Sequence, residues 1–156
     1  MSENLIPLER LTDLHTGHSR LMGLDLGTKT IGIAISDSRL KVATARTTLT
    51  RRKFTLDVEE LVRLAGREEV FAFVLGLPLN MDGSEGRRAQ STRSFARNMT
   101  RHTDLPVVLW DERLSTYAAD QAMIEADMSR KKRAEKIDAV AAAIILQGAL
   151  DQLQAG

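Results

Sequence analysis

The chain has 156 residues, of which 43% are hydrophobic and 28% charged, with a net charge of +1, so it is long enough for one domain with a real core and is not intrinsically disordered. It has no cysteine, which excludes disulfides and thiolate chemistry. Residues 1–20 lack the apolar core of a signal peptide and no later stretch is apolar enough to cross a bilayer, so we expect a cytoplasmic protein with no membrane partner.

Strands and helices follow an N-terminal arm (1–20) in a recognisable order. Continuous or alternating apolar residues indicate strands, and apolar residues at i, i+3, i+4 and i+7 indicate helices. In chain order we predict strands near 21–26, 30–36 and 41–49, a helix ending at Gly66, a strand at 70–77, a helix with Ser84 as N-cap, a strand at 105–110, and helices near 116–128 and 135–153.

This order predicts a single α/β domain over 21–153. The first three strands form an antiparallel meander, and two later strands join in parallel through right-handed crossovers, which gives a mixed five-stranded sheet. Helices should cover both faces of the sheet. The expected architecture is a ribonuclease-H-like fold.

An acidic residue interrupts the first predicted strand, in the stretch LMGLDLGTKTIGIAIS. Asp25 stands where an unpaired buried carboxylate is costly. Small residues, among them Gly23, Gly32 and Ala34, are expected on the same face of the hairpin. Two interpretations stay open: the small residues leave room for a substrate backbone above the carboxylate, or a helix packs closely on them.

Two further acidic sites lie beside apolar elements. Asp111 and Glu112 directly follow the strand at 105–110, and Asp138 is the only polar side chain in IDAVAAAIIL. A divalent cation would explain all of these acids, because Mg²⁺ and Mn²⁺ prefer carboxylate and water oxygens. Simpler explanations are also open. Asp111 and Glu112 could form a solvated turn paired with Arg113, and Asp138 could lie in the first turn of a helix, where the dipole favours a negative charge.

Basic residues form local clusters in a chain that is nearly neutral overall. Such clusters can neutralise phosphates, or they can be solvated helix faces. The loop at 80–86 precedes a predicted helix N-terminus, whose free amides can hold a phosphate, although a structural turn explains the loop as well. The candidate nucleic-acid contacts are Lys29, Arg87, Arg113, Lys132 and Lys136.

Four motifs occur in order between about Leu21 and Leu150: GLDLGTKTIGIAISD, GLPLNMDGSEG, DERLST and IDAVAAAIILQ. Together they resemble the YqgF/RuvX family of Holliday-junction-resolvase-like nucleases, also described as pre-16S rRNA nucleases. The resemblance implies a ribonuclease-H-like fold with acidic metal-binding residues for Mg²⁺ or Mn²⁺. Carried over by motif, the catalytic and metal-binding residues are Asp25, Glu112 and Asp138, with Asp111 as an adjacent fourth metal ligand.

Phosphodiester hydrolysis explains why acidic residues would gather. Two cations about 3.5–4 Å apart can activate a water and stabilise the leaving oxygen. We therefore hypothesise that Asp25 bridges two ions, with Glu112 and Asp138 each holding one of them.

The expected function is 5′-end processing of pre-16S rRNA in ribosome biogenesis, and the expected partner is nucleic acid. One alternative is a Holliday-junction resolvase in DNA recombination and repair, which would favour a homodimer, whereas an RNA-trimming enzyme can be a monomer. Another is a non-catalytic nucleic-acid-binding factor in transcription or ribosome assembly. GLDLGTKTIGIA also resembles the phosphate loop of actin-like and sugar-kinase ATPases, but those proteins need two such domains.

Overall fold

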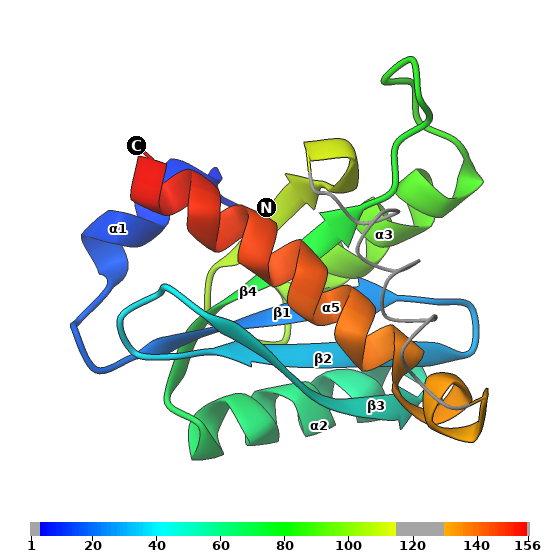
Figure 1. The fold of residues 1–156 in the computed structure, drawn as a ribbon, viewed down its shortest axis with the longest axis horizontal. Helices are drawn as coiled ribbons and strands as arrows, with labels where there is room; N and C mark the ends of the chain where they lie inside the picture. Colours follow the sequence, from blue (N-terminus) through cyan, green and yellow to red (C-terminus); the bar gives the residue numbers. More distant parts are fainter. Residues whose placement is uncertain (1–3, 115–129, 156) are drawn as a thin grey trace.

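The computed structural model describes residues 4–114 and 130–155, with the backbone alone for 130–137. The predicted helix at 116–128 lies outside the described residues. The elements in chain order are η1 (Leu8–Arg10), α1 (Leu11–Leu14), β1 (Arg20–Leu26), β2 (Thr30–Ser36), β3 (Ala43–Thr50), α2 (Phe54–Arg67), β4 (Val70–Leu77), α3 (Arg87–Met99), β5 (Val107–Asp111), η2 (Glu112–Leu114) and α5 (Arg130–Ala155) (Figure 1).

The strands form one mixed sheet in the order β3-β2-β1-β4-β5. The first three strands pair antiparallel, β4 pairs parallel with β1, and β5 pairs parallel with β4. The predicted sheet is therefore confirmed, and β1 lies at its centre. The strand ends differ from the predicted ones by no more than two residues, because Gly, Pro and polar turns mark them clearly in the sequence.

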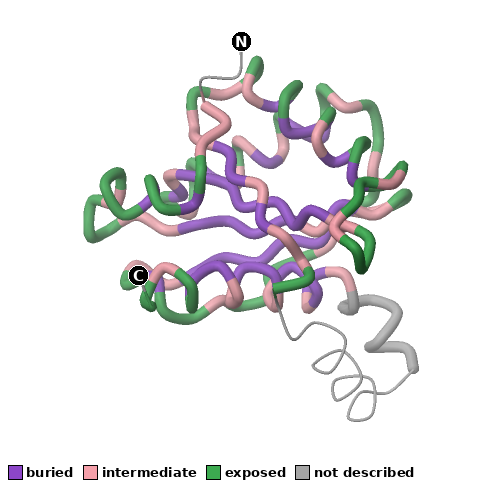
Figure 2. Tube along the Cα trace, turned by 90° about the horizontal axis from the view of Figure 1, so that it is seen from above, coloured by how far each residue is buried: buried purple, intermediate pink, exposed green. Residues whose placement is uncertain are grey.

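Helices cover both faces of this sheet, as predicted. α5 crosses one face, while α2 and α3 cover the other (Figure 1). Buried residues concentrate in β1, β2, β4 and β5 between these helices (Figure 2). Alternation along the strands separates two cores. Leu21 and Val74 pack with Leu146 of α5, whereas Leu24 and Phe73 belong to the cluster formed with α2 and α3.

The N-terminal arm packs on the sheet, although its residues show no helix or strand periodicity. Leu8 and Leu11 are buried in the core under α5. Ile6 donates a backbone hydrogen bond to the Val107 carbonyl (3.0 Å), and Leu5 forms a parallel bridge with the same residue. The elements here are a single turn each, too short for helical periodicity to appear. Among the described residues, no helix is long and apolar enough to cross a lipid bilayer.

α5 packs closely on the small residues of β1 and β2. A Cβ atom added to Gly23 would lie 2.7 Å from Cβ of Leu146, and one added to Gly32 would overlap the backbone carbonyl of Asp138. The small-residue face is thus occupied by a helix. Of the two interpretations of these residues, close helix packing is correct, and open space for a substrate backbone is wrong.

Gly32→Ala is expected to lower the free energy of unfolding by about 3 kcal/mol or more, at or beyond the upper end of overpacking costs, because the new methyl group meets helix backbone. Urea unfolding measures the change. Gly66→Ala is the matched control: its Cβ would meet nothing within 4 Å in α2, so it should add about 0.5–1 kcal/mol instead. Equal effects of the two substitutions would contradict the close packing.

Candidate active site

Asp25 lies in the central strand between two glycines on neighbouring strands. Gly32 of β2 is its cross-strand partner, and Gly76 of β4 follows Leu75, which pairs with Leu24. Directly paired residues of antiparallel strands project to the same face. Because a Cβ on Gly32 would point at α5, Asp25 also projects to the α5 face. Its neighbours on the two adjacent strands, Gly32 and Gly76, have no side chains.

The other two predicted acids lie where these glycines leave space. A Cβ on Gly76 would lie 2.5 Å from Oε1 of Glu112, so the Glu112 side chain folds back from the end of β5 over β4. The backbone of Asp138 lies over Gly32, and Oδ2 of Asp138 accepts a hydrogen bond from the Thr30 hydroxyl. The structure thus brings together three acids that are far apart in the sequence.

The pKa values show that these carboxylates interact. Burial, and then the charge of Asp138, raise the pKa of Asp25 to about 6, against a smaller lowering by Arg88. Burial, and then the charge of Asp25, raise the pKa of Glu112 to about 7, with Arg88 again opposing and Asp111 adding to the rise. Asp25 is therefore the acid that interacts with both of the others. Raised pKa values at converging carboxylates are typical of functional sites.

These carboxylates fit a divalent cation by their chemistry. Carboxylate oxygens are preferred ligands of Mg²⁺ and Mn²⁺, and a bound cation would relieve the repulsion that adds to the effect of burial on the two pKa values. Within the part of the chain that the structure describes, no group of three or more Asp, Glu or His side chains is already spaced as a metal site. The acids are related instead as two pairs that share Asp25, and these three residues are the ones that would hold metal.

Thr30→Val is expected to weaken Mg²⁺ or Mn²⁺ binding by about 10–100-fold, the usual effect of losing a hydrogen bond that orients a metal-binding carboxylate. The Thr30 hydroxyl is the donor to Oδ2 of Asp138. Calorimetric titration with Mn²⁺ measures the change, and Thr30→Ser, which keeps the hydroxyl, should restore most of the affinity. Wild-type affinity in Thr30→Val would show that this hydrogen bond does not orient a ligand.

Asp138 does not lie in the first turn of its helix. α5 begins at Arg130, five residues before the predicted start, which places Asp138 more than two turns inside the helix. Because the helix dipole acts mainly within the first turn, the explanation of Asp138 by the dipole is wrong. The basic run at 130–133 forms the first turn of α5 instead.

Asp111 and Arg113 form an ion pair at the end of β5. Nη2 of Arg113 donates to Oδ2 of Asp111 at 2.7 Å, and Nε donates to both carboxylate oxygens at 3.1 Å. These hydrogen bonds hold the pKa of Asp111 below its usual range. Asp111 is thus paired with Arg113 in a turn, as the simpler explanation predicts, whereas the Glu112 side chain lies over β4. Asp111 could act as a metal ligand only if this ion pair opened. The same holds for Arg113 as a phosphate contact.

The loop between β4 and α3 forms its own turn. The Gly83 amide donates to the Asn80 carbonyl, and the Asn80 amide donates to the Ser84 carbonyl, both at 2.9 Å. These hydrogen bonds support the structural interpretation of the loop itself, whereas phosphate binding by the first amides of α3 stays a prediction. Ser84 is not the N-cap, since α3 begins at Arg87 with Gly86 before it and has no side-chain cap.

The remaining candidate nucleic-acid contacts are either exposed or have side chains outside the described residues. Lys29, in the turn between β1 and β2, and Arg87, the first residue of α3, are both exposed. Lys132 and Lys136 belong to the N-terminal part of α5, but their side chains are outside the described residues.

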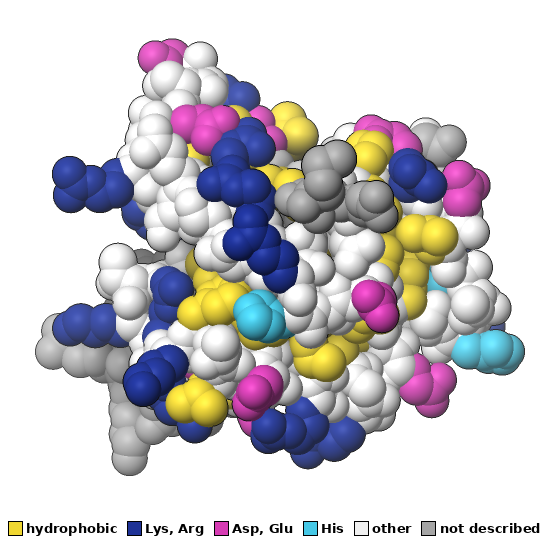
Figure 3. All heavy atoms as spheres, turned by 180° about the vertical axis from the view of Figure 1, so that it is seen from behind, with side chains coloured by type: hydrophobic (Ala, Val, Ile, Leu, Met, Phe, Trp, Pro, Cys, Tyr) yellow, Lys and Arg dark blue, Asp and Glu magenta, His cyan; other side chains and the backbone are white. Residues whose placement is uncertain are grey.

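Arg88 acts on the candidate site, although the sequence pattern does not single it out. Its Nη2 donates to the Leu26 carbonyl at 3.4 Å, and its charge lowers the pKa values of Asp25 and Glu112. It is thus the described cation that acts on both acids. Four arginines lie in α3, and Lys and Arg side chains gather in several groups on the face of the molecule opposite α5 (Figure 3).

The helical phase of α3 could have identified Arg88. It lies four residues before Thr92 and seven before Phe95, and both of these are buried. Residues at this spacing share one stripe of a helix, so Arg88 continues the sheet-facing stripe while Arg87 is turned about 100° away. Only this difference in helical phase distinguishes Arg88 from the neighbouring Arg87, which is the candidate contact named from the sequence.

Comparison with known proteins places the chain in a family. A family model described as "RuvX: Holliday junction resolvase" matches residues 19–152. A protein from Rhodobacter capsulatus, named as a pre-16S rRNA nuclease, is 61% identical over 133 residues, which cover 85% of this chain and 84% of that protein. One of the same name from Chelativorans sp. is 56% identical over 152 residues, or 97% of this chain and 95% of that protein.

Two solved structures share the fold. T. thermophilus RuvC in complex with a Holliday junction substrate has a TM-score of 0.58 at 13% identity, and the match covers 88% of this chain and 97% of RuvC. The yeast mitochondrial Holliday junction resolvase Ydc2 has a TM-score of 0.50 at 14% identity, over 95% of this chain and 86% of Ydc2. At such identities the likeness shows the fold alone, and it confirms the predicted ribonuclease-H-like architecture.

The sequence matches are much closer than the structural ones and extend over almost the whole sheet and α5. The family model and the relatives together support a hydrolase that acts on ester bonds of nucleic acid. The chain therefore belongs to the RuvX (YqgF) family.

Proposed function

We propose that this protein is a metal-dependent nuclease of the cytoplasm that trims the 5′ end of precursor 16S rRNA. The observation that carries the proposal is the convergence of Asp25, Glu112 and Asp138 on one face of the sheet, with Asp25 interacting with both of the others. The choice of substrate is supported by the names of the relatives at 61% and 56% identity.

Each acid would have a separate role. Divalent ions held here would lower the pKa of an attacking water and stabilise the leaving oxygen. Asp25 would be shared between ions, while Glu112 and Asp138 would each bind on one side of it, and Thr30 would fix the orientation of Asp138. Arg88 would balance part of the negative charge that a phosphate brings to these acids.

A comparison of two substrates tests this function. Purified protein is incubated in Mn²⁺ with a precursor 16S rRNA fragment and, separately, with a four-way DNA junction, and each reaction is repeated in EDTA. We expect cleavage of the RNA that depends on Mn²⁺. Nucleic-acid binding that persists in EDTA, without cleavage of either substrate in Mn²⁺ or Mg²⁺, would contradict it and would favour a non-catalytic binding factor.

Resolution of Holliday junctions is the second candidate, because the matching family model carries that description. A junction resolvase cuts two strands symmetrically, so this activity would require a homodimer on the junction. Light scattering of the protein with and without a junction, combined with the cleavage assay, separates the two candidates. Symmetric paired cuts by a dimer would favour the resolvase, and RNA trimming by a monomer would favour rRNA processing.

A further inference from the structure

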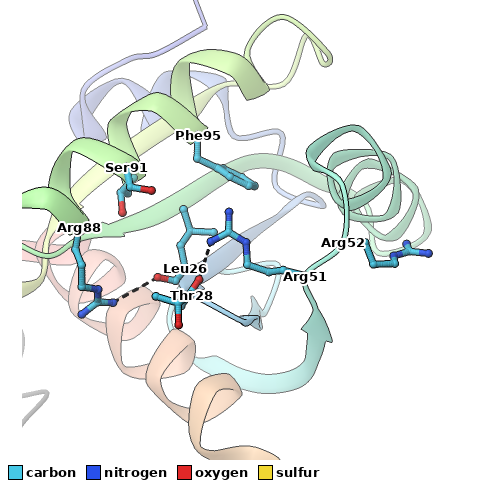
Figure 4. Close-up of a pocket in the computed structure, with 9 residues that line it drawn as sticks. Leu26, Thr28, Arg51, Arg52, Arg88, Ser91 and Phe95 are labelled. Atoms are coloured by element: carbon cyan, nitrogen blue, oxygen red, sulfur yellow. Dashed lines mark hydrogen bonds between the residues drawn. The ribbon is translucent and has the colours of Figure 1, made fainter.

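A pocket of about 470 Å³ lies between α3, the turn after β1 and the segment that follows β3. Its lining includes Gly27, Thr28, Arg51, Arg88, Ser91 and Phe95 (Figure 4). Among the described residues, the charged ones that line it are three arginines, and no described acidic residue lines it. Its size lies within the range of small-molecule sites.

We propose that this arginine pocket binds a phosphate group of the nucleic-acid substrate, a few nucleotides away from the bond that is cut. The inference rests on the proposed nuclease function and deepens it, because it assigns a substrate-positioning site to residues outside the acidic cluster.

Two of the guanidinium groups are fixed in place before any ligand arrives. Nη1 of Arg51 donates to the Gly27 carbonyl at 2.6 Å, and its Cζ lies 5.5 Å from the centre of the Phe95 ring. Nη2 of Arg88 donates to the Leu26 carbonyl at 3.4 Å. A guanidinium has five N–H donors in a rigid fork that matches phosphate geometry, so both groups keep donors for a ligand.

The segment that carries Arg51 is anchored by a buried carboxylate. Asp57 is only 2% exposed, and its two oxygens accept hydrogen bonds from the Arg52 amide at 3.1 and 3.2 Å. The Arg52 side chain points away from Arg51 and Arg88 (Figure 4). The proposed phosphate contacts are therefore Arg51 and Arg88, with the exposed hydroxyls of Thr28 and Ser91 as neutral partners.

The position of the pocket relates it to the acids. Thr28 follows Asp25 by three residues, and three residues of chain span at most about 11 Å. Arg88 connects the two places, since it lines the pocket and its Nη2 donates at 3.4 Å to the carbonyl of Leu26, the residue after Asp25. The acids lie on the α5 face and the pocket lies beside α3. A nucleic-acid strand with one phosphate at the acids would therefore pass around the turn after β1 to place a nearby phosphate in the pocket.

Two serines of α3 allow a matched test. Ser91 lines the pocket, whereas Ser94 lies outside it and accepts a hydrogen bond from Arg97; both are exposed, so both tolerate glutamate. Ser91→Glu is expected to raise KM for precursor RNA by about 10-fold, equivalent to about 1.4 kcal/mol of binding, with kcat changed less than about 2-fold. Ser94→Glu adds the same charge and should leave KM within about 2-fold of wild type.

A binding measurement without catalysis shows whether the pocket binds a backbone phosphate or a terminal 5′-phosphate. The same variants are titrated in EDTA with single-stranded RNA that bears either a 5′-phosphate or a 5′-hydroxyl. Equal weakening of both oligonucleotides by Ser91→Glu assigns the pocket to a backbone phosphate, and weakening of the 5′-phosphorylated one alone assigns it to a terminal phosphate. Either result supports the pocket, whereas equal affinities of Ser91→Glu and Ser94→Glu for both oligonucleotides would overturn it.

The two proposals fail in different ways. Wild-type cleavage of RNA, together with identical KM and affinity for the two variants, would overturn the pocket and leave the nuclease function intact. Weaker RNA binding by Ser91→Glu than by Ser94→Glu, in a protein that cleaves nothing, would overturn the nuclease function and support the pocket.

Discussion

Asp25→Asn is expected to reduce Mn²⁺-dependent cleavage by about 10³-fold or more. Asp25 is the acid that interacts with both Glu112 and Asp138, so its carboxylate is the one that each bound ion would share. Loss of several kcal/mol of charge stabilisation in the transition state corresponds to this factor. Single-turnover cleavage of precursor RNA measures it. A rate near that of wild type in Mg²⁺ or Mn²⁺, with the fold intact, would contradict the proposed site.

The same variant carries its own control for folding. Burial and Asp138 raise the pKa of Asp25 to about 6 in the folded protein, above its unfolded value, so folding favours the protonated form. The associated stability is present at low pH and is lost as the pH rises through about 6. Without metal, Asp25→Asn should therefore unfold with a free energy about 1–3 kcal/mol higher at pH 8, and nearly unchanged at pH 4.

A variant that loses activity while it gains metal-free stability cannot be inactive because it is misfolded. This combination also separates a functional carboxylate from a structural one. A buried carboxylate that only satisfies backbone groups would lose stability on replacement by Asn. Lower stability of Asp25→Asn at pH 8 would therefore indicate a structural role.

The sheet could be predicted because each of its strands is marked by residues within or next to that strand. Periodicity marks each strand, turn residues mark its ends, and the right-handed crossover rule leaves few ways to connect the strands. The N-terminal arm was not predicted to pack, since its one-turn elements carry no periodicity and its anchor, Val107, is about a hundred residues away. The sequence predicts the start of α5 near residue 135, five residues too late, because the basic residues at 130–133 show no apolar periodicity.

The acids of the candidate site are conspicuous in the sequence, but their surroundings are not. A carboxylate in an apolar segment is conspicuous in the sequence, as Asp25 and Asp138 are. Which neighbour each acid takes depends on side-chain direction: Asp111 turns to Arg113, whereas the next residue, Glu112, folds over Gly76. The glycines beside Asp25 suggested open space, but only the packing of α5 shows that backbone and carboxylates occupy it.

Binding of Mg²⁺ is expected to release protons in a pH-dependent manner. The pKa values of Asp25 and Glu112 are raised to about 6 and about 7, and a divalent ion binds only the deprotonated carboxylates. Binding should therefore release roughly 1.4 protons at pH 6 and about 0.1 at pH 8. At limiting Mg²⁺, cleavage should fall by about 100-fold per pH unit once the pH is below both values. Calorimetry in buffers of different ionisation enthalpy measures the protons.

Two variants assign this proton release to the site. Glu112→Gln removes the group with the higher pKa, so release at pH 6 should fall to about 0.5 protons, the share of Asp25 alone, or lower if its pKa drops without the charge of Glu112. Asp37→Asn removes a carboxylate whose pKa is already below its usual range, where amides of the turn after β2 bind it, and should change nothing. Release that is equal at pH 6 and pH 8 would mean that the ion binds elsewhere, because only carboxylates with raised pKa values still hold protons near neutrality.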